Sequence, residues 1–119
     1  MPAGLERLYR RPRVRRLLTK HFGRAYYYAL DTTLGSTHWL GATVLKYPTD
    51  LWSYQEIVAE TRPDLIVETG TWRGGSALFL AGLLDALGDG TVISIDIERR
   101  GEPPRHPRVE YWLGSSTMR

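Results

Sequence analysis

Two carboxylates in this sequence each follow an apolar run, and several glycines follow the first of them. In "DLIVETGTWRGGSALFLA" (residues 64–81), Glu68 ends the run, and Gly70 and Gly74 come shortly after it. Asp96 ends a second run, "TVISID". A carboxylate can accept hydrogen bonds from a ribose diol or pair with a cationic ligand, and glycines let a ligand approach backbone amides closely. These residues point to a nucleoside-containing cofactor, although strands that end in acids also occur in sheets that bind no ligand.

The spacing of the glycines helps to choose among cofactors. A dinucleotide-binding loop has a glycine two positions after its first glycine, and here that position holds Trp72. The negative charge of Glu68 would repel a pyrophosphate and attract a cation. S-adenosylmethionine has a sulfonium and an ammonium group and no phosphate, and its carboxylate suits the amide-rich start of a helix at residues 74–76. We therefore expect S-adenosylmethionine rather than NAD, while Asp96 by itself supports only a nucleoside ligand.

The elements that must position these residues form a βαβ unit. Residues 65–68 read as a short, continuous and fully buried strand, 75–87 as a helix stopped by Gly88, and 91–97 as a β-branched strand. The two strands should be parallel, and ligands of such sheets bind beyond the carboxyl ends of the strands. A third strand is expected at residues 109–113.

The segments before this unit are less regular. Residues 31–41 are rich in Thr, Ser and Gly and are expected to form a loop. A helix is expected over about residues 50–60, with Ser53 and Glu56 at capping-box spacing and Pro63 as its stop. The fold class that we expect is α/β: the N-terminal part of a Rossmann-like parallel sheet with flanking helices.

Composition limits the classes of protein. The 119 residues are 42% hydrophobic and 24% charged, as in an ordinary globular domain. The sequence shows no apolar run of membrane-spanning length and no secretory signal pattern. With no cysteine, a thiolate nucleophile and a zinc–sulfur site are excluded. We expect a cytoplasmic protein without a transmembrane segment.

Positive charge is concentrated at the N-terminus. Residues 1–24 contain eight basic side chains and a single acidic one, Glu6, whereas the rest of the chain is mildly acidic. We expect two parts, a basic arm over residues 1–24 and a partial cofactor-binding domain over residues 25–119. Leucines and a valine in the arm suggest a weak amphipathic helix interrupted by Pro12. The ordinary interpretation is a solvated helix or a disordered leader; the alternatives are binding to nucleic acid, to anionic lipid or to an acidic protein surface.

Several motifs together resemble a known family. "VETGTWRGGSALFLA" is similar to the first motif of class I S-adenosylmethionine-dependent methyltransferases, in the E-x-G-x-x-x-G-x-S form of the catechol O-methyltransferase type. The longer segment "WLGATVLKYPTDLWSYQEIVAETRPDLIVETGTWRGGSALFLA", with "VISIDIE" and "HPRVEYWLGSS", resembles the cephalosporin hydroxylase / rhamnosyl O-methyltransferase family. The likeness covers about residues 39–116.

The resemblance implies a role for individual residues. It places Glu68, Gly70 and Thr71 by the methionine moiety of the cofactor, with Gly74 in the same loop and Ser76 by the methionine carboxylate. It places Asp96 on the ribose hydroxyls and Ser115 or Ser116 at the adenine. A segment ahead of the first strand, with Lys46, Tyr54 and Gln55, would cover the cofactor mouth; for Tyr54 the alternative is packing in the core.

The resemblance also implies residues that this sequence does not contain. The family's sheet has seven strands, and its divalent-metal (magnesium) and substrate residues follow the fourth. We therefore expect an incomplete chain in which no catalytic residue and no metal ligand can be named. His38 and His106 are each isolated in a loop of the sequence, so we expect surface or packing roles for them.

The expected function is O-methyl transfer to a hydroxylated small molecule, sugar or lipid. The alternative is a non-catalytic cofactor-binding or interaction module; a dehydrogenase fragment is disfavoured by Trp72. With half a sheet, residues 65–68 would form an edge strand, through which the chain could form a homo-oligomer.

Overall fold

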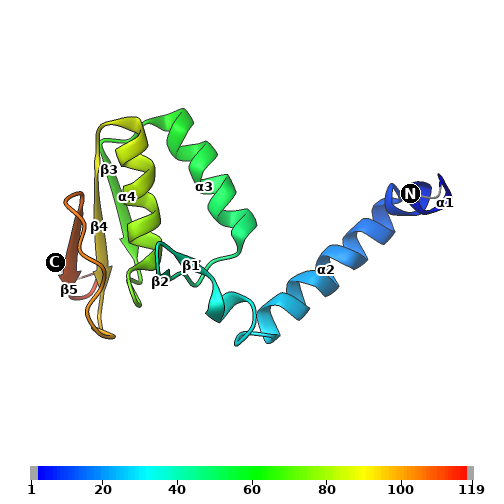
Figure 1. Cartoon of the computed structure of the whole chain (residues 1–119), viewed down its shortest axis with the longest axis horizontal. Coiled ribbons are helices and arrows are strands. Elements are labelled where there is room, and N and C mark those ends of the chain that lie inside the picture. Colours follow the sequence, from blue (N-terminus) through cyan, green and yellow to red (C-terminus); the bar gives the residue numbers. More distant parts are fainter. Residues whose placement is uncertain (1–2, 118–119) are drawn as a thin grey trace.

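A parallel sheet of three strands forms the centre of this α/β fold. The structure, a computed structural model, describes residues 3–117. Strands β3 (Leu65–Thr69), β4 (Thr91–Asp96) and β5 (Val109–Leu113) lie in the order β3-β4-β5, and both pairs are parallel (Figure 1). All three strands that the sequence predicts are confirmed, and their carboxyl ends meet at one edge of the sheet.

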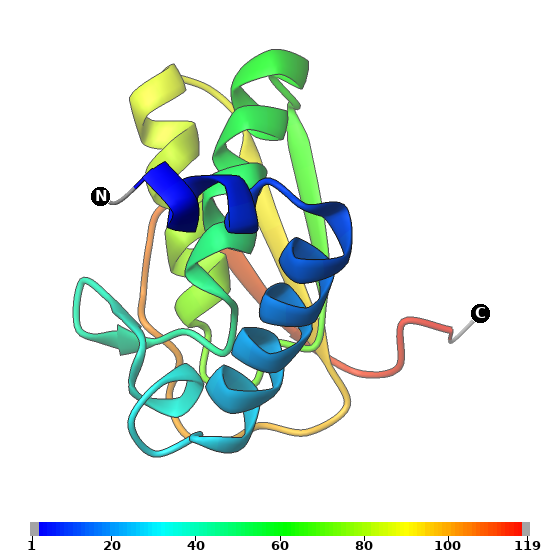
Figure 2. The same ribbon diagram turned by 90° about the vertical axis from the view of Figure 1, so that its right-hand side faces the viewer.

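Two helices cover one face of this sheet. Helix α4 (Gly75–Leu87) packs on β4, and α3 (Pro48–Thr61) packs on α4 from outside (Figures 1 and 2). Both predicted ends of α4 are confirmed, because Gly74 and Gly88 flank it with φ angles of 78° and 91°, which favour glycine. The core between the layers consists of Val58, Ala77, Ala81, Leu84 and Val92.

The opposite face of the sheet is bare among residues 3–117. Leu65 and Val67 are 49% and 55% exposed, and Trp112 on β5 is 52% exposed. The prediction that residues 65–68 are fully buried was therefore wrong: side chains of a strand alternate between two faces, and only one face of β3 is covered here. The prediction that β3 is an edge strand is confirmed.

Helix α3 begins earlier than the sequence suggested. Its N-cap is Tyr47 and Pro48 occupies its first position, where a proline is pre-organised for the helix. Ser53 lies inside the helix and its hydroxyl donates to the Thr49 carbonyl at 3.1 Å, so the proposed capping box is wrong.

A small hairpin replaces part of the expected loop. After a 3-10 turn (Leu34–Ser36), β1 (His38–Trp39) pairs antiparallel with β2 (Ala42–Thr43). The hairpin packs on the start of α4, where a Cβ atom on Gly75 would collide with the Thr43 carbonyl oxygen. Trp39 meets Phe79 of α4 edge to face at 5.0 Å between ring centroids.

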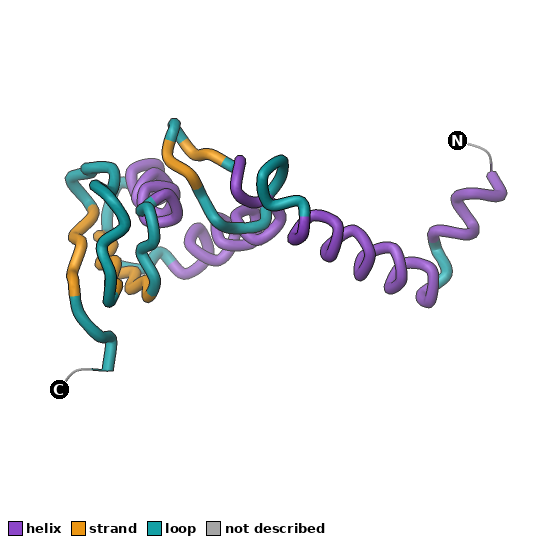
Figure 3. Tube along the Cα trace, turned by 90° about the horizontal axis from the view of Figure 1, so that it is seen from below, coloured by secondary structure: helices purple, strands orange, loops and turns teal. Residues whose placement is uncertain are grey.

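The N-terminal helices extend away from the rest of the molecule. Helix α1 (Ala3–Tyr9) is followed by α2 (Pro12–Tyr28), which confirms a helical arm interrupted next to Pro12 (Figure 3). Helix α2 continues through residue 24, so the division of the chain at that residue stays a prediction. Within residues 3–117, no helix has both the length and the apolar character needed to cross a membrane.

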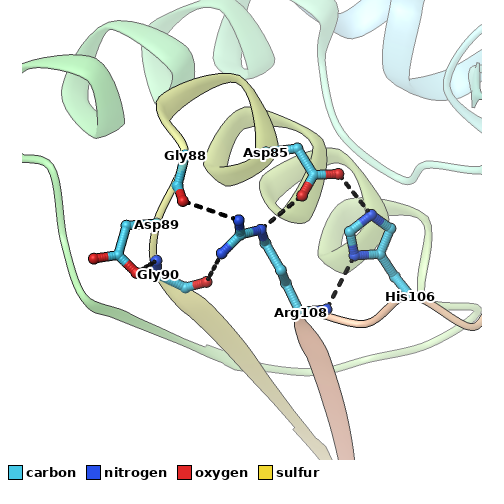
Figure 4. Close-up of polar contacts among 6 residues, drawn as sticks. All are labelled: Asp85, Gly88, Asp89, Gly90, His106 and Arg108. Atoms are coloured by element: carbon cyan, nitrogen blue, oxygen red, sulfur yellow. Dashed lines mark hydrogen bonds and ion pairs between the residues drawn. The ribbon is translucent and has the colours of Figure 1, made fainter.

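A polar cluster fixes the end of α4 that lies far from the strands' carboxyl ends. Asp85 accepts hydrogen bonds from Arg108 Nε at 2.6 Å and from His106 Nε2 at 3.0 Å, and Arg108 also donates to the carbonyls of Gly88 and Gly90 (Figure 4). The Arg108 hydrogen bond is the main reason that the pKa of Asp85 is lowered. This cluster joins the α4–β4 turn to β5, so His106 has a structural role.

Candidate functional site

The candidate site lies at the carboxyl ends of the strands, around the loop that joins β3 to α4. The loop extends the sheet by one bond, from Gly70 N–H to the Ile95 carbonyl at 2.8 Å, and then turns sharply. Gly70 and Trp72 have φ angles of 91° and 49°. For tryptophan such a conformation is strained, and strained backbone of this kind is concentrated at functional sites.

Glu68 is the central acceptor of a hydroxyl network. Its Oε2 accepts a hydrogen bond from Ser94 Oγ at 2.8 Å, and its Oε1 accepts one from Ser76 Oγ. Because Ser94 has a single hydroxyl proton, Thr71 Oγ1, at 2.7 Å, must donate to Ser94. Residues from β3, β4, the loop and α4 are thus joined through a single carboxylate.

The register of the sheet produces this arrangement. Glu68, Ser94 and Tyr111 are paired across the three strands and lie on the face that α4 covers. Ser94 is completely buried, and Tyr111 donates its hydroxyl proton to the Pro104 carbonyl at 2.9 Å. Burial, with a smaller contribution from the charge of Glu68, raises the pKa of Tyr111 to about 12. The tyrosine is therefore neutral and can only act as a hydrogen-bonding group.

Sequence reasoning missed Ser94 and Tyr111. The available signal was the serine within "TVISID": a hydroxyl at an inward-facing strand position must find a partner when it is buried. The partner, Glu68, becomes evident only once the register is known.

Asp96 is held at the end of β4 by two backbone N–H groups. Its Oδ2 accepts from Trp72 N at 2.9 Å and its Oδ1 from Glu98 N at 3.1 Å. These two bonds, Trp72 first, lower the pKa of Asp96. The carboxylate is therefore ionised at neutral pH, and each oxygen keeps a lone pair for a further donor. The bond to Trp72 also holds the strained loop in place.

A hollow of about 210 Å³ opens at the start of α4. Gly70, Thr71, Gly75 and Ser76 line one side of it, and Thr43 and Lys46 line the other. Gly74 precedes the helix and offers no side-chain cap, so the first N–H groups of α4 receive no bond from it. The amides and the Lys46 ammonium make this hollow favourable for an anion.

A larger hollow of about 410 Å³ lies between α3 and the free edge of β3 and reaches Glu68, Ser76 and Lys46. Tyr54 lines it too, with its ring centroid 5.7 Å from Lys46 Nζ. Of the three residues expected in the segment ahead of β3, Lys46 and Tyr54 therefore lie at the candidate site. Gln55 is on α3 and lines neither hollow.

Two predicted residues lie apart from the Glu68 network. Ser115 and Ser116 follow β5, and Gly114 N–H donates to the Asp96 carbonyl at 2.8 Å, which keeps their turn beside the end of β4. The Ser115 hydroxyl pairs with Thr117 Oγ1 at 2.8 Å.

A metal site is not formed by the described part of the chain. Within residues 3–117, no three His, Cys, Asp or Glu side chains gather closely enough to hold an ion. His38 lies on the hairpin, where its Nδ1 is 2.7 Å from the Ser36 carbonyl oxygen.

Sequence comparison identifies relatives over most of this chain. The family described as rhamnosyl O-methyltransferase/CmcI matches residues 31–118. The rhamnosyl O-methyltransferase of Mycobacterium leprae is 39% identical over 85 residues, which make up 69% of this chain and 37% of that protein. The Mycobacterium tuberculosis protein of the same name is 33% identical over 104 residues, 84% of this chain and 42% of that protein. The chain thus spans less than half the length of these relatives.

Comparison with solved structures identifies the same family. A CmcI structure with SAH is 30% identical and superposes with a TM-score of 0.63 over 70% of this chain and 46% of that one. A CmcI structure with Mg-SAM gives a TM-score of 0.64 at the same identity, over 69% of this chain and 37% of that one. The expected fold class is confirmed.

Proposed function

The chain belongs to the rhamnosyl O-methyltransferase/CmcI family, and from this premise we propose that it forms the cofactor-binding part of an S-adenosylmethionine-dependent O-methyltransferase. The observation that carries the proposal is the arrangement around the β3–α4 loop. Two ionisable acids, Glu68 and Asp96, are held by hydrogen bonds on either side of a strained glycine loop, next to a free helix N-terminus.

The residues present suit the charges of S-adenosylmethionine. Its carboxylate would be held by the first amides of α4 and by Lys46, its ammonium by Glu68, and its ribose diol by Asp96. The hydroxyl of Ser76 donates to Glu68, so Ser76 would meet the cofactor carboxylate through its backbone N–H. Gly70 and Thr71 would line the methionine moiety, Gly74 would start the helix, and Ser115 or Ser116 would reach the adenine.

When bound, the cofactor supplies an electrophilic methyl group on a sulfonium leaving group. The residues of this chain would bind and orient it: Glu68 would hold its ammonium and Asp96 its ribose diol, and the Ser76–Glu68–Ser94–Thr71 network would keep the loop rigid. Alignment of this kind is the main contribution that a protein makes to methyl transfer.

The acceptor in this proposal is a hydroxylated small molecule, sugar or lipid. Magnesium would accompany it, as in the CmcI structure with Mg-SAM. Within residues 3–117, no three His, Cys, Asp or Glu side chains form a ligand set for that ion. The ligands of the metal, and the group that accepts the proton of the acceptor hydroxyl, would therefore be other residues. We place the protein in the cytoplasm, in keeping with a sequence that lacks cysteine.

A second candidate is a cofactor-binding or interaction module without catalysis. It is favoured by the free edge of β3 and by the exposed Leu65 and Val67, which offer a surface for pairing with another chain or a second copy.

Calorimetric titration with S-adenosylmethionine, SAH and NAD tests the proposal. We expect binding of the first two and weaker binding of NAD, because Trp72 stands where a dinucleotide loop needs glycine and Glu68 repels pyrophosphate. Tighter binding of NAD would contradict the proposal.

A further inference from the structure

Helix α2 has two faces of opposite chemistry. At 3.6 residues per turn, Val14, Leu17, Leu18, Phe22 and Ala25 fall on one side, at the i, i+3, i+4 spacing of an amphipathic helix, and His21 is the polar residue among them. The opposite side of the helix, and both borders between the two sides, carry the basic residues Arg13, Arg15, Arg16, Lys20 and Arg24.

Within residues 3–117, the body of the protein leaves the apolar face of α2 largely exposed. Leu17 is 55% exposed and Phe22 is 64% exposed. The C-terminal part of α2 is attached to the body through Tyr47. The Tyr47 hydroxyl donates a hydrogen bond to the Gly23 carbonyl at 3.0 Å, and the ring centroids of Tyr47 and Tyr26 are 5.0 Å apart. At 100° per residue Gly23 falls on the side of the helix opposite the apolar face, and Tyr26 falls just beyond the border of that face, so the attachment leaves the apolar face open along the helix (Figures 1 and 3).

The charge of the arm is unbalanced. Residues 1–24 carry eight basic side chains and Glu6, and Glu6 already pairs with Arg10 at 2.7 Å. A nucleic acid would use these charges but would leave Leu17, Leu18 and Phe22 in water. A bilayer with anionic lipids uses both faces, because acyl chains accept the apolar side chains and headgroup phosphates attract the arginines at its borders.

We propose that α2 is a membrane-surface anchor, which lies in the plane of an anionic bilayer with its Leu17–Leu18–Phe22 face toward the acyl chains. The exposed Tyr28 at the end of the same face would lie at the headgroup level, where tyrosine is favoured. The anchor would hold the body and its candidate site at the membrane surface. This proposal does not depend on the identity of the cofactor.

Vesicle co-sedimentation of the whole chain tests the anchor. We expect binding to phosphatidylcholine vesicles that contain phosphatidylglycerol, and little binding to phosphatidylcholine alone. Leu17→Ser with Phe22→Ser, which keeps every charge, should weaken binding about tenfold or more and leave retention on heparin unchanged. Trp52→Ser is the matched control, because Trp52 is an equally exposed apolar side chain on α3, and it should bind like the unchanged chain.

The absence of cysteine permits a test of orientation by single spin labels. A spin label on Leu18→Cys should become protected from a water-soluble paramagnetic relaxation agent when anionic vesicles are added. A spin label on Lys20→Cys, on the basic face, should stay accessible to that agent. Circular dichroism and thermal unfolding of the body would show that each variant remains folded.

Three results would overturn the proposal. Equal accessibility of the two labels on vesicles would mean that α2 does not lie at the interface. Unchanged vesicle binding after loss of Leu17 and Phe22 would mean that the arm binds polyanions by charge alone. Protection of the Leu18 label without vesicles would mean that protein covers the apolar face.

Discussion

Glu68 can end a strand inside an apolar sheet because two hydroxyl groups satisfy its oxygens. Ser94 reaches it across the sheet at 2.8 Å and Ser76 reaches it from α4, so the charge is solvated by protein. The same bonds place an ionisable acid at the base of the glycine loop, where a cationic group of the cofactor would bind.

Ser94→Ala should loosen this network. Removal of the hydroxyl leaves Glu68 Oε2 and Thr71 Oγ1, both partly buried, without this partner, and we expect a loss of about 1–3 kcal/mol in the free energy of unfolding. Urea unfolding would measure it, with Thr91→Ala, an exposed position of the same strand, as control. A change no larger than that of the control would show that the network does not stabilise the fold.

Asp96→Ala should weaken S-adenosylmethionine binding by about 1.5–3 kcal/mol, the usual contribution of charge-assisted hydrogen bonds. Because the pKa of Asp96 is lowered below 3.8, this contribution should persist as the pH falls from 7 to about 5 and disappear only when the pH passes through that lowered pKa. Calorimetry at several pH values would test both statements, with Glu98→Ala as control. Unchanged affinity in a folded variant would limit Asp96 to holding the loop through Trp72.

At this scale the sequence located the acids but not their partners. Glu68 and Asp96 could be found because each ends an apolar run, and strand ends meet at one edge of a parallel sheet. The direction of the Ser76 hydroxyl depends on a side-chain rotamer, and the Ser94 contact depends on strand register. Neither is encoded in local spacing.

Among the elements, the hairpin β1–β2 is fitted closely to α4. Gly75→Ala should separate them, because the added Cβ would collide with the Thr43 carbonyl, and we expect a loss of about 1–3 kcal/mol in the free energy of unfolding. Gly82→Ala is the control in the same helix: its Cβ would lie 3.5 Å from Trp39, an ordinary contact, and alanine favours a helix. Equal stability of the two variants, measured by thermal unfolding, would show that the hairpin moves without cost.

The Asp85 cluster gives a pH dependence that belongs to the α4–β5 connection. The pKa of Asp85 is lowered in the folded chain, chiefly by the Arg108 hydrogen bond. Its stabilisation is therefore present above the unfolded pKa of about 3.9 and is lost as the pH falls through the lower folded value. Asp85→Asn should lower the melting temperature at pH 7 and flatten the acid limb of the stability curve. Asp64→Asn, an exposed control, should leave both nearly unchanged, and an acid limb as steep in Asp85→Asn as in the original chain would contradict this account.

The element bounded by glycine at both ends was the most predictable. Helix α4 has glycine on both sides and was predicted to the residue, whereas Pro48 opened α3 earlier than the capping-box pattern suggested. The hairpin was missed because its strands have two residues each, too few for an alternating pattern. Residues 65–68 have the composition of a strand covered on both faces, and the residues described here cover only one.

At the scale of the whole molecule, this one-sided sheet leads to the last prediction: the chain of 119 residues does not catalyse methyl transfer by itself and self-associates. Leu65, Val67 and Trp112 expose apolar surface on the bare face, and β3 offers unpaired backbone groups at its edge. The cofactor side of a site is present in Glu68 and Asp96, but residues 3–117 form no metal cluster.

Light scattering on a size-exclusion column should show dimers or larger species that grow with concentration, and Val67→Lys, which places a charge on the bare face, should shift them toward the monomer. Trp52→Ser, on the outer helix α3, should not. A radiolabel assay with S-adenosylmethionine and a hydroxylated acceptor should give only background transfer. A monodisperse monomer that methylates the acceptor would contradict the prediction, and it would assign catalytic groups to the hollow between α3 and β3, where Lys46 and Tyr54 already lie beside Glu68.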